Sequence, residues 1–305
     1  MPTTDLDPPW SVGGTQDPRG VGVRCEGVVH LYRTFAGHDV VALRGIDLTI
    51  AAGERVAFLG PSGCGKSTLL TLLGGIQRPS AGRVFLGDEE ISRLSERRLA
   101  SVRSRLVSTM LQGATRNLLP YATARQNIAF ARLGTSTRGR DDLPGPAELL
   151  DVVDLADQRD QVVSTMSGGQ RQRLALACAI ATGPRLLLAD EPTSALGHGD
   201  REAVVALLHR IGTDFGTTVV VVTHQAEVAA TFARTITMKG GRIGAEGRSG
   251  SEYAVVGEEG LLHLPTQLAE LWPAGTLVRI EQDGDDRLAI AREDTARPEG
   301  PGRTA

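Results

Sequence analysis

The sequence predicts an α/β fold, in which helices cover both faces of a mainly parallel sheet and a small β-rich appendage follows. Two observations support this prediction. Between residues 55 and 232, short apolar runs typical of buried strands alternate with stretches of helical periodicity. After about residue 247, several short runs of strand-forming residues surround one short helical segment.

The composition limits the classes of protein to which the chain can belong. Its 305 residues suit one large domain or two, and 41% hydrophobic with 23% charged residues is ordinary for a soluble globular protein. The formal net charge of −3 provides no general basic field, so no nucleic-acid partner is expected. No apolar run approaches the ~20 residues of a membrane span. Three scattered cysteines predict reduced thiols in a cytosolic protein.

The first part of the chain is predicted as follows. Residues 1–20 are rich in proline, aspartate, glycine and threonine, which predicts disorder. Apolar alternation over residues 21–51 predicts strands. The apolar run 55–59 is expected to be a buried strand that leads into a glycine-rich loop, and residues 67–74 then place their leucines on one side of a helix. Residues 95–105 are expected to form an arginine-bearing helix.

The second part continues the alternation and then changes character. Helices are expected near residues 147–154, 170–181, 201–212 and 226–232, and strands at residues 185–189 and 217–223. Shorter strands are expected at residues 253–256, 261–264, 276–280 and 287–290, around a helix at residues 265–271. We therefore divide the chain into a disordered segment (1–20), an α/β domain (21–248), a small β-rich domain (249–292) and a disordered tail (293–305).

The glycine-rich loop reads G-P-S-G-C-G-K-S, which matches the phosphate-binding motif G-x-x-x-x-G-K-[ST]. Its glycines let the backbone curl tightly enough to aim several N–H groups at one phosphate chain. Lys66 is expected to reach the β- and γ-phosphates, and the Ser67 hydroxyl to ligate Mg²⁺. Only Lys66 and Lys239 among the 33 basic residues are lysines, so this lysine is unlikely to be incidental. The nucleotide-binding residues of this loop are Gly60, Pro61, Ser62, Gly63, Cys64, Gly65, Lys66, Ser67 and Thr68.

A second glycine motif lies at residues 166–173, M-S-G-G-Q-R-Q-R. Ser167, Gly168 and Gly169 are expected at the N terminus of a helix, where free N–H groups and the positive end of the helix dipole favour an anion. The alternative is a glycine turn that merely starts a helix. Beside the phosphate loop, the anion-binding interpretation is favoured.

Two acidic residues directly follow the apolar run 186–189. Asp190 is expected to hold Mg²⁺, directly or through water. Glu191 is in position to polarise the attacking water, as the general base of in-line phosphoryl transfer. The alternative is a strand end with two solvated acids, which the following P-T-S-A-L sequence disfavours.

These motifs, in this order, resemble the ATP-binding cassette (ABC) transporter ATPases over residues 21–248. The most specific match is Ser167 to Gln170, similar to the family's L-S-G-G-Q signature with Met166 in place of leucine. The resemblance implies that Ser167, Gly168, Gly169 and Gln170 bind the γ-phosphate of an ATP held by the opposite subunit.

The resemblance also assigns three residues outside these motifs. His224 matches the switch histidine, expected to contact the γ-phosphate and to arrange Glu191 and water. Gln112 matches the Q-loop glutamine, which senses Mg²⁺ and links the nucleotide to the membrane partner. Tyr32 matches the aromatic residue that stacks on adenine, and stacking predicts weak selectivity for ATP over GTP.

The resemblance implies an ATPase that uses ATP and Mg²⁺ and works with two kinds of partner. A second copy, or a related ATPase subunit, would complete each site in a head-to-tail dimer. A separate integral membrane permease would place the chain on the cytoplasmic face of the membrane. The lead-in V-A-L-R-G-I-D-L-T-I and the Q-loop region look most like the lipoprotein-release and macrolide-export group, so export is the expected direction. The alternative is a regulatory ABC ATPase without a transport role.

Two features depart from this pattern. Gly197 stands where the family's D-loop usually has an aspartate that bridges the subunits, so we expect looser coupling between hydrolysis and dimer closure. Residues 254–292 resemble, more weakly, the AbrB-type swapped-hairpin domains, some of which bind DNA. Residues 250–305 carry 11 acidic and 5 arginine residues, a net charge of −6, which argues against DNA and for a dimerisation or regulatory role.

Overall fold

The computed structural model describes residues 19–33, 39–134, 143–248, 251–254, 272, 276–282 and 288–292. The chain divides into two compact units, Met1–His263 and Leu264–Ala305. Several predictions lie outside the described residues: the disorder expected over residues 1–18 and 293–305, the strand at 261–264 and the helix at 265–271. Among the described helices, none is long and apolar enough to cross a membrane.

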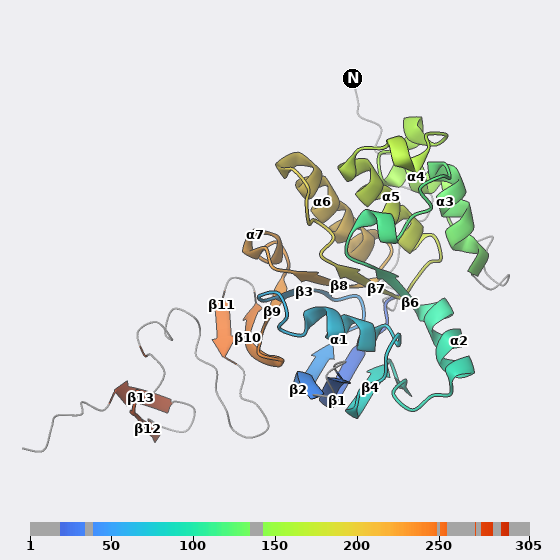
Figure 1. The fold of residues 1–305 in the computed structure, drawn as a ribbon. Helices are drawn as coiled ribbons and strands as arrows, with labels where there is room; N and C mark the ends of the chain where they lie inside the picture. The colour runs from blue at the N-terminus through green and yellow to red at the C-terminus, as the bar shows by residue number, and fades with distance from the viewer. Residues whose placement is uncertain are drawn as a thin grey trace, which may run out of the picture. The chain divides into compact units, whose positions relative to one another are not determined.

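A seven-stranded sheet forms the centre of the first unit, in the order β11-β10-β9-β3-β8-β7-β6 (Figure 1). The five strands from β9 to β6 pair in parallel, and β10 pairs antiparallel with both of its neighbours, β9 and β11, so the mainly parallel sheet is confirmed. The strands are β3 (Arg55–Leu59), β6 (Val107–Met110), β7 (Leu186–Asp190), β8 (Thr218–Thr223), β9 (Arg234–Lys239), β10 (Arg242–Arg248) and β11 (Ser251–Ala254).

A second, antiparallel sheet of four strands packs in the same unit, in the order β2-β1-β4-β5. Its strands are β1 (Val23–Arg33), β2 (Asp39–Ile50), β4 (Ala81–Leu86) and β5 (Glu89–Glu90). Helix α1 (Lys66–Leu73) lies between the two sheets and contacts strands of both (Figure 1). The phosphate loop at its N terminus is therefore held between two layers.

The apolar strands of the large sheet are buried on both faces. Val219 and Val221 of β8 belong to one hydrophobic core, whereas Val220 and Val222 belong to the other. Successive side chains of a strand point to opposite faces, so an unbroken apolar run indicates a strand with a core on each side. One core packs against α1 and the antiparallel sheet, and the other against the remaining helices.

The remaining helices gather mostly on the opposite face of the large sheet from α1 (Figure 1). They are α3 (Ala124–Ala131), α4 (Pro146–Val152), α5 (Gly168–Ile180), α6 (His198–Asp214) and α7 (Ala226–Ala229), while α2 (Glu96–Leu106) packs beside β6. Short 3₁₀ turns lie at Ala114–Arg116, Arg132–Gly134, Ala156–Gln158 and Val163–Thr165.

Several elements differ from their predicted extent; helix α6, for example, spans His198–Asp214 instead of residues 201–212, and strands β4, β6, β9 and β10 and helix α3 were not predicted. Helix α7 ends at Ala229 instead of residue 232, because the N–H groups of Thr231 and Phe232 donate to carbonyls three residues back instead of four. Strand β11 pairs with β10 and so continues the large sheet beyond residue 248. The domain boundaries stay a prediction. In the second unit, β12 (Val278–Gln282) and β13 (Leu288–Arg292) form an antiparallel pair where strands were expected.

Candidate active site

The phosphate loop joins the end of β3 to the start of α1 and requires glycine at two positions. A Cβ on Gly60 would lie 2.3 Å from the Met238 carbonyl oxygen. Gly65 has φ of 103°, and a Cβ there would lie 2.6 Å from the Ala42 carbonyl oxygen. Both obstacles are backbone atoms, which cannot swing away as a side chain can. Close backbone packing within the chain therefore requires glycine at these two positions of the loop.

Lys66 lies inside the curl of this loop. Its Nζ donates to the carbonyl oxygens of Gly60 at 2.6 Å and Pro61 at 2.9 Å, and the residue is only 6% exposed. Helix α1 begins at Lys66 and carries no acidic residue in its first turn. The positive end of the helix dipole and the ammonium therefore act together, which is the arrangement that binds phosphate.

Ser67 and Asp190 come together from two different elements. The Ser67 hydroxyl donates to Asp190 Oδ1 at 3.1 Å, which joins the first turn of α1 to the end of β7. Burial raises the pKa of the Asp190 carboxyl above its ordinary value, and the Ser67 hydrogen bond opposes this shift. A hydroxyl and a carboxylate are the oxygen ligands that Mg²⁺ accepts alongside nucleotide phosphates, so this pair fits the ion.

Glu191 and His224 form the second pair at this edge of the sheet. The Glu191 backbone is left-handed, with φ of 49°, and its N–H donates to the Val222 carbonyl at 2.9 Å. Its Oε1 lies 2.9 Å from His224 Nδ1. Its Oε2 is buried without a hydrogen-bond partner among the described residues. One carboxylate oxygen is thus held and the other is free to accept a proton.

The signature residues form the N terminus of α5. Ser167 Oγ accepts from the Gln170 N–H at 3.1 Å, and Gln170 Oε1 accepts from the Ser167 N–H at 2.9 Å, a reciprocal capping box. Ser167 and Gly168 are exposed, whereas Met166 is buried and fills the core position in place of leucine. A contact within the chain explains why residue 169 is glycine, because a Cβ there would lie 2.1 Å from Asp200 Oδ1. No hydrogen bond joins these residues to the phosphate loop within the described part of the chain.

The D-loop shows the opposite situation at Gly197. This residue is the N-cap of α6, with φ of −65° and ψ of 169°, which any residue can adopt. A Cβ on Gly197 would meet nothing within 4 Å. The fold of this chain therefore does not require glycine where the family usually has aspartate. Asp200, three residues later, packs against Gly169.

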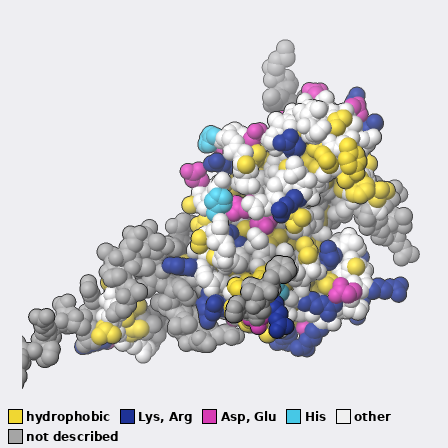
Figure 2. All heavy atoms as spheres, viewed as in Figure 1, with side chains coloured by type: hydrophobic (Ala, Val, Ile, Leu, Met, Phe, Trp, Pro, Cys, Tyr) yellow, Lys and Arg dark blue, Asp and Glu magenta, His cyan; other side chains and the backbone are white. Residues whose placement is uncertain are grey.

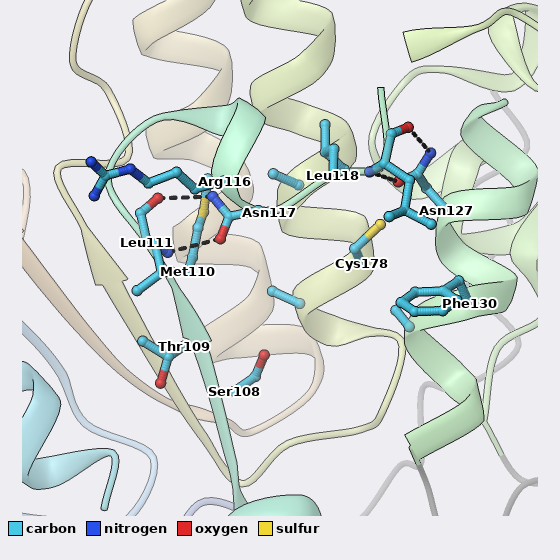
Figure 3. Close-up of a pocket in the computed structure, with 14 residues that line it drawn as sticks. Ser108, Thr109, Met110, Leu111, Arg116, Asn117, Leu118, Asn127, Phe130 and Cys178 are labelled. Carbon is cyan, nitrogen blue, oxygen red and sulfur yellow. Dashed lines mark hydrogen bonds between the residues drawn. The ribbon is translucent and has the colours of Figure 1, made fainter. Parts of the chain in front are cut away.

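Gln112 is exposed in the loop that follows β6, at the same sheet edge as Asp190. Asn117 closes this loop: its Oδ1 accepts from the Leu111 N–H at 2.9 Å, and its Nδ2 donates to the Leu111 carbonyl at 2.8 Å (Figure 3). The same Nδ2 also donates to the Gly113 carbonyl at 3.0 Å. The loop that carries Gln112 is thus a closed unit. Sequence reasoning missed this role of Asn117.

Tyr32 lies at the end of β1, beside the first turn of α1. Its hydroxyl donates to Gln77 Oε1 at 2.9 Å and lies 3.3 Å from Thr68 Oγ1. The residue is 38% exposed. The aromatic ring is therefore brought next to the phosphate loop from a strand more than thirty residues earlier. Sequence reasoning did not single out Gln77, because no local pattern pairs it with Tyr32.

A strand, glycine loop and helix with a buried lysine, a serine–aspartate pair and a glutamate held by histidine define a P-loop ATPase. Comparisons with known proteins narrow this class. Residues 43–194 match the family model described as ABC transporter. The lipoprotein-releasing system ATP-binding protein LolD of Geobacter metallireducens is 40% identical over 208 residues, which cover 68% of this chain and 91% of that protein.

The macrolide export ATP-binding/permease protein MacB of Rhodopirellula baltica is 39% identical over 213 residues, 69% of this chain. The chain spans only 31% of that longer protein. A solved dimeric structure of the ATP-binding cassette MJ0796, in a post-hydrolysis state with ADP and Pi, matches with a TM-score of 0.65 and 32% identity. That match covers 74% of this chain and 98% of the cassette.

The chain therefore belongs to the ABC transporter family, as an ATP-binding subunit whose reaction is ATP hydrolysis. The predicted fold class and family are confirmed, and the group expected from the lead-in includes two of the relatives found. The weaker AbrB-type resemblance and the regulatory alternative gain no support from these comparisons.

Proposed function

We propose that two copies of this chain, or one copy and a related subunit, enclose two ATP molecules head to tail and drive a separate membrane permease. The observation that carries this proposal is the exposed, capped N terminus of α5, which would suit an anion and makes no hydrogen bond to its own phosphate loop among the described residues. The dimeric ADP-bound cassette found by comparison supports the same arrangement.

Within each site, this chain's residues would share the work of phosphoryl transfer. The loop N–H groups and Lys66 would bind the phosphate chain. Ser67, Asp190 and Gln112 would hold Mg²⁺, which neutralises charge on the phosphate oxygens. The Oε2 of Glu191 would take a proton as the water oxygen bonds to the γ-phosphorus and the bond to the ADP oxygen breaks. His224 would keep the carboxylate oriented through its contact with Oε1.

The permease is proposed to dock in a groove beside the Q-loop. A cavity of about 400 Å³ is lined by β6, the loop residues 116–119, α3 and α5 (Figure 3). Phe130 at its rim is 57% exposed, and hydrophobic atoms gather over α3 in Figure 2. Because Asn117 both lines the cavity and closes the Gln112 loop, a bound apolar segment would act directly on that loop. The relative that carries ATP-binding and permease functions together supports a permease as occupant.

The decisive experiment for the catalytic half of this proposal is Glu191→Gln. The amide cannot accept the water proton, so turnover is expected to fall by at least about 100-fold while ATP binding persists. The variant should then accumulate as an ATP-bound dimer in size-exclusion chromatography. Glu202→Gln makes the same change on an exposed residue of α6 and should behave as the unmodified protein. Wild-type turnover in Glu191→Gln would contradict the general-base assignment.

A membrane permease as partner bears on the location of the chain and on the direction of substrate transport. We propose that the chain is peripheral on the cytoplasmic face of the membrane and that the complex exports its substrate. Co-purification with a membrane protein tests the first proposal. Substrate transport assayed in inside-out and right-side-out vesicles tests the second, because ATP added outside reaches the chain only in the inside-out form.

A further inference from the structure

We propose that Gln77, just beyond the far end of the phosphate-loop helix, is a positioning residue that holds Tyr32 in the orientation that receives the nucleobase. The inference rests on the proposed stacking role of Tyr32 and names the group that fixes it. Tyr32 Oη donates to Gln77 Oε1 at 2.9 Å, a good hydrogen-bond distance.

Gln77 is itself held firmly at the end of α1. After Leu73 the chain turns back, and the N–H groups of Ile76 and Gln77 both donate to the Thr71 carbonyl, at 2.9 and 3.2 Å. This turn leaves Gln77 partly buried, with its side chain directed to Tyr32. A side chain on a fixed backbone loses less conformational entropy in making a bond, so it orients its partner more effectively.

The same connection also fastens the strand that carries Tyr32. The Ser80 N–H donates to the Val29 carbonyl at 2.9 Å, and Ser80 Oγ accepts from the Leu31 N–H at 3.0 Å. The His30 ring lies edge-on to the Tyr32 ring, with centroids 4.7 Å apart and an interplanar angle of 83°. Backbone, ring and hydroxyl of Tyr32 are therefore each restrained by a different neighbour.

This arrangement has a consequence for base recognition. A tyrosine has one hydroxyl proton, and the shorter of its two contacts is to Gln77, so that proton is committed. The Tyr32 hydroxyl thus offers no free donor to the edge of a base, and the ring face is what remains for contact. Every purine has such a face, so the geometry points to binding that discriminates little between ATP and GTP.

The test measures ATP affinity of the isolated chain by calorimetry for five variants. Tyr32→Ala removes the ring, Tyr32→Phe removes only the hydroxyl, and Gln77→Met removes the amide that carries the acceptor. Gln77→Glu keeps an acceptor, and the fifth variant combines Tyr32→Phe with Gln77→Met. Gln161→Met makes the same change at a glutamine whose amide donates to Thr165, and serves as the matched control.

Loss of one such hydrogen bond is expected to weaken ATP binding about fivefold in Tyr32→Phe and in Gln77→Met. The double variant should be no weaker than either single one, because both remove the same contact. Gln77→Glu should bind better than Gln77→Met. In turnover assays KM should rise by the same factor while kcat changes little, which general damage to the fold would not produce.

Two results would overturn the inference, and they are distinguishable. If Tyr32→Ala binds ATP as tightly as the unmodified chain, Tyr32 does not stack on the base, and both the proposed stacking role and its support by Gln77 are wrong. If Tyr32→Ala weakens binding but Gln77→Met does not, Tyr32 stacks on the base and Gln77 does not position it. The same conclusion follows if the two single effects add in the double variant. The permease takes no part in either result.

Discussion

The phosphate loop and the D-loop differ in whether contacts within the chain require glycine. In the phosphate loop, a side chain at Gly60 or Gly65 would collide with backbone carbonyls of the same chain. In the D-loop, a side chain at Gly197 would meet nothing within 4 Å. These two glycines of the phosphate loop are therefore required by packing within a single chain. Packing within the chain does not require glycine at position 197.

The largest effect expected of a single substitution in these loops contrasts the two glycines directly. Gly60→Ala forces a Cβ into the Met238 carbonyl, so the loop must shift, and an overpacking cost of about 1–3 kcal/mol that falls on nucleotide binding would lower ATP affinity about 5- to 150-fold. Gly197→Ala adds the same methyl group in open space and should leave ATP affinity unchanged. Calorimetry with ATP on both variants checks this, and equal losses would break the comparison.

Chemical modification of the phosphate loop provides the next test. Cys64 is buried in the loop with Sγ 3.9 Å from Lys66 Nζ, so an alkyl group there should fill the phosphate site and abolish ATP binding. Bound ATP should protect the thiol, as mass spectrometry of the labelled peptide can show. Burial raises the pKa of Cys25 and of Cys178 to about 12, which keeps both protonated and poorly nucleophilic at pH 8. Cys64→Ala should retain ATP binding after treatment; loss of binding there would assign the effect to another residue.

The cost of adding a Cβ at Gly169 should lie between the costs at Gly60 and Gly197, because the atoms in the way belong to a side chain. Gly169→Ala pushes against the Asp200 carboxylate, the movable end of a side chain, and should lower the free energy of unfolding by about 1 kcal/mol. Asp200→Ala removes the obstacle, so the added cost of Gly169→Ala should vanish in that background. Denaturant unfolding of the four proteins measures this cycle. Equal costs in both backgrounds would mean that Asp200 is not what requires glycine at this position.

The sequence predicted features that lie within one short segment better than contacts between distant segments. The β3–loop–α1 unit, the acidic pair at the end of β7 and the position of His224 follow from local patterns, because each lies within one short segment. Contacts between distant segments left no such pattern. The Tyr32–Gln77 bond spans 45 residues. The Asn117 closure of the Gln112 loop is local, but an asparagine in a loop has many possible partners. The pairing of β11 with β10 likewise joins residues on either side of the predicted boundary at residue 248, where composition indicated separate domains.

Gly197→Asp is expected to have the smallest effect on the stability of the isolated chain. It is also the substitution that tells most about the contact between two subunits. Aspartate is about as good an N-cap as glycine, to within a few tenths of a kcal/mol, so the thermal stability of the isolated chain should barely change. If the family's cross-subunit contact is what Gly197 lacks, the carboxylate should strengthen the ATP-bound dimer and make ATP hydrolysis more cooperative. Dimer formation is measured by sedimentation in the Glu191→Gln background, where the ATP-bound state is expected to persist.

Gly197→Asn separates capping from charge, because asparagine caps a helix equally well but carries no charge. A tighter dimer with aspartate and not with asparagine would assign the effect to a charged contact across the interface. The same gain with both would assign it to a better-ordered start of α6. No change with either would mean that the open space around Gly197 stays open in the dimer, so the difference between the two loops would no longer reflect the partner subunit.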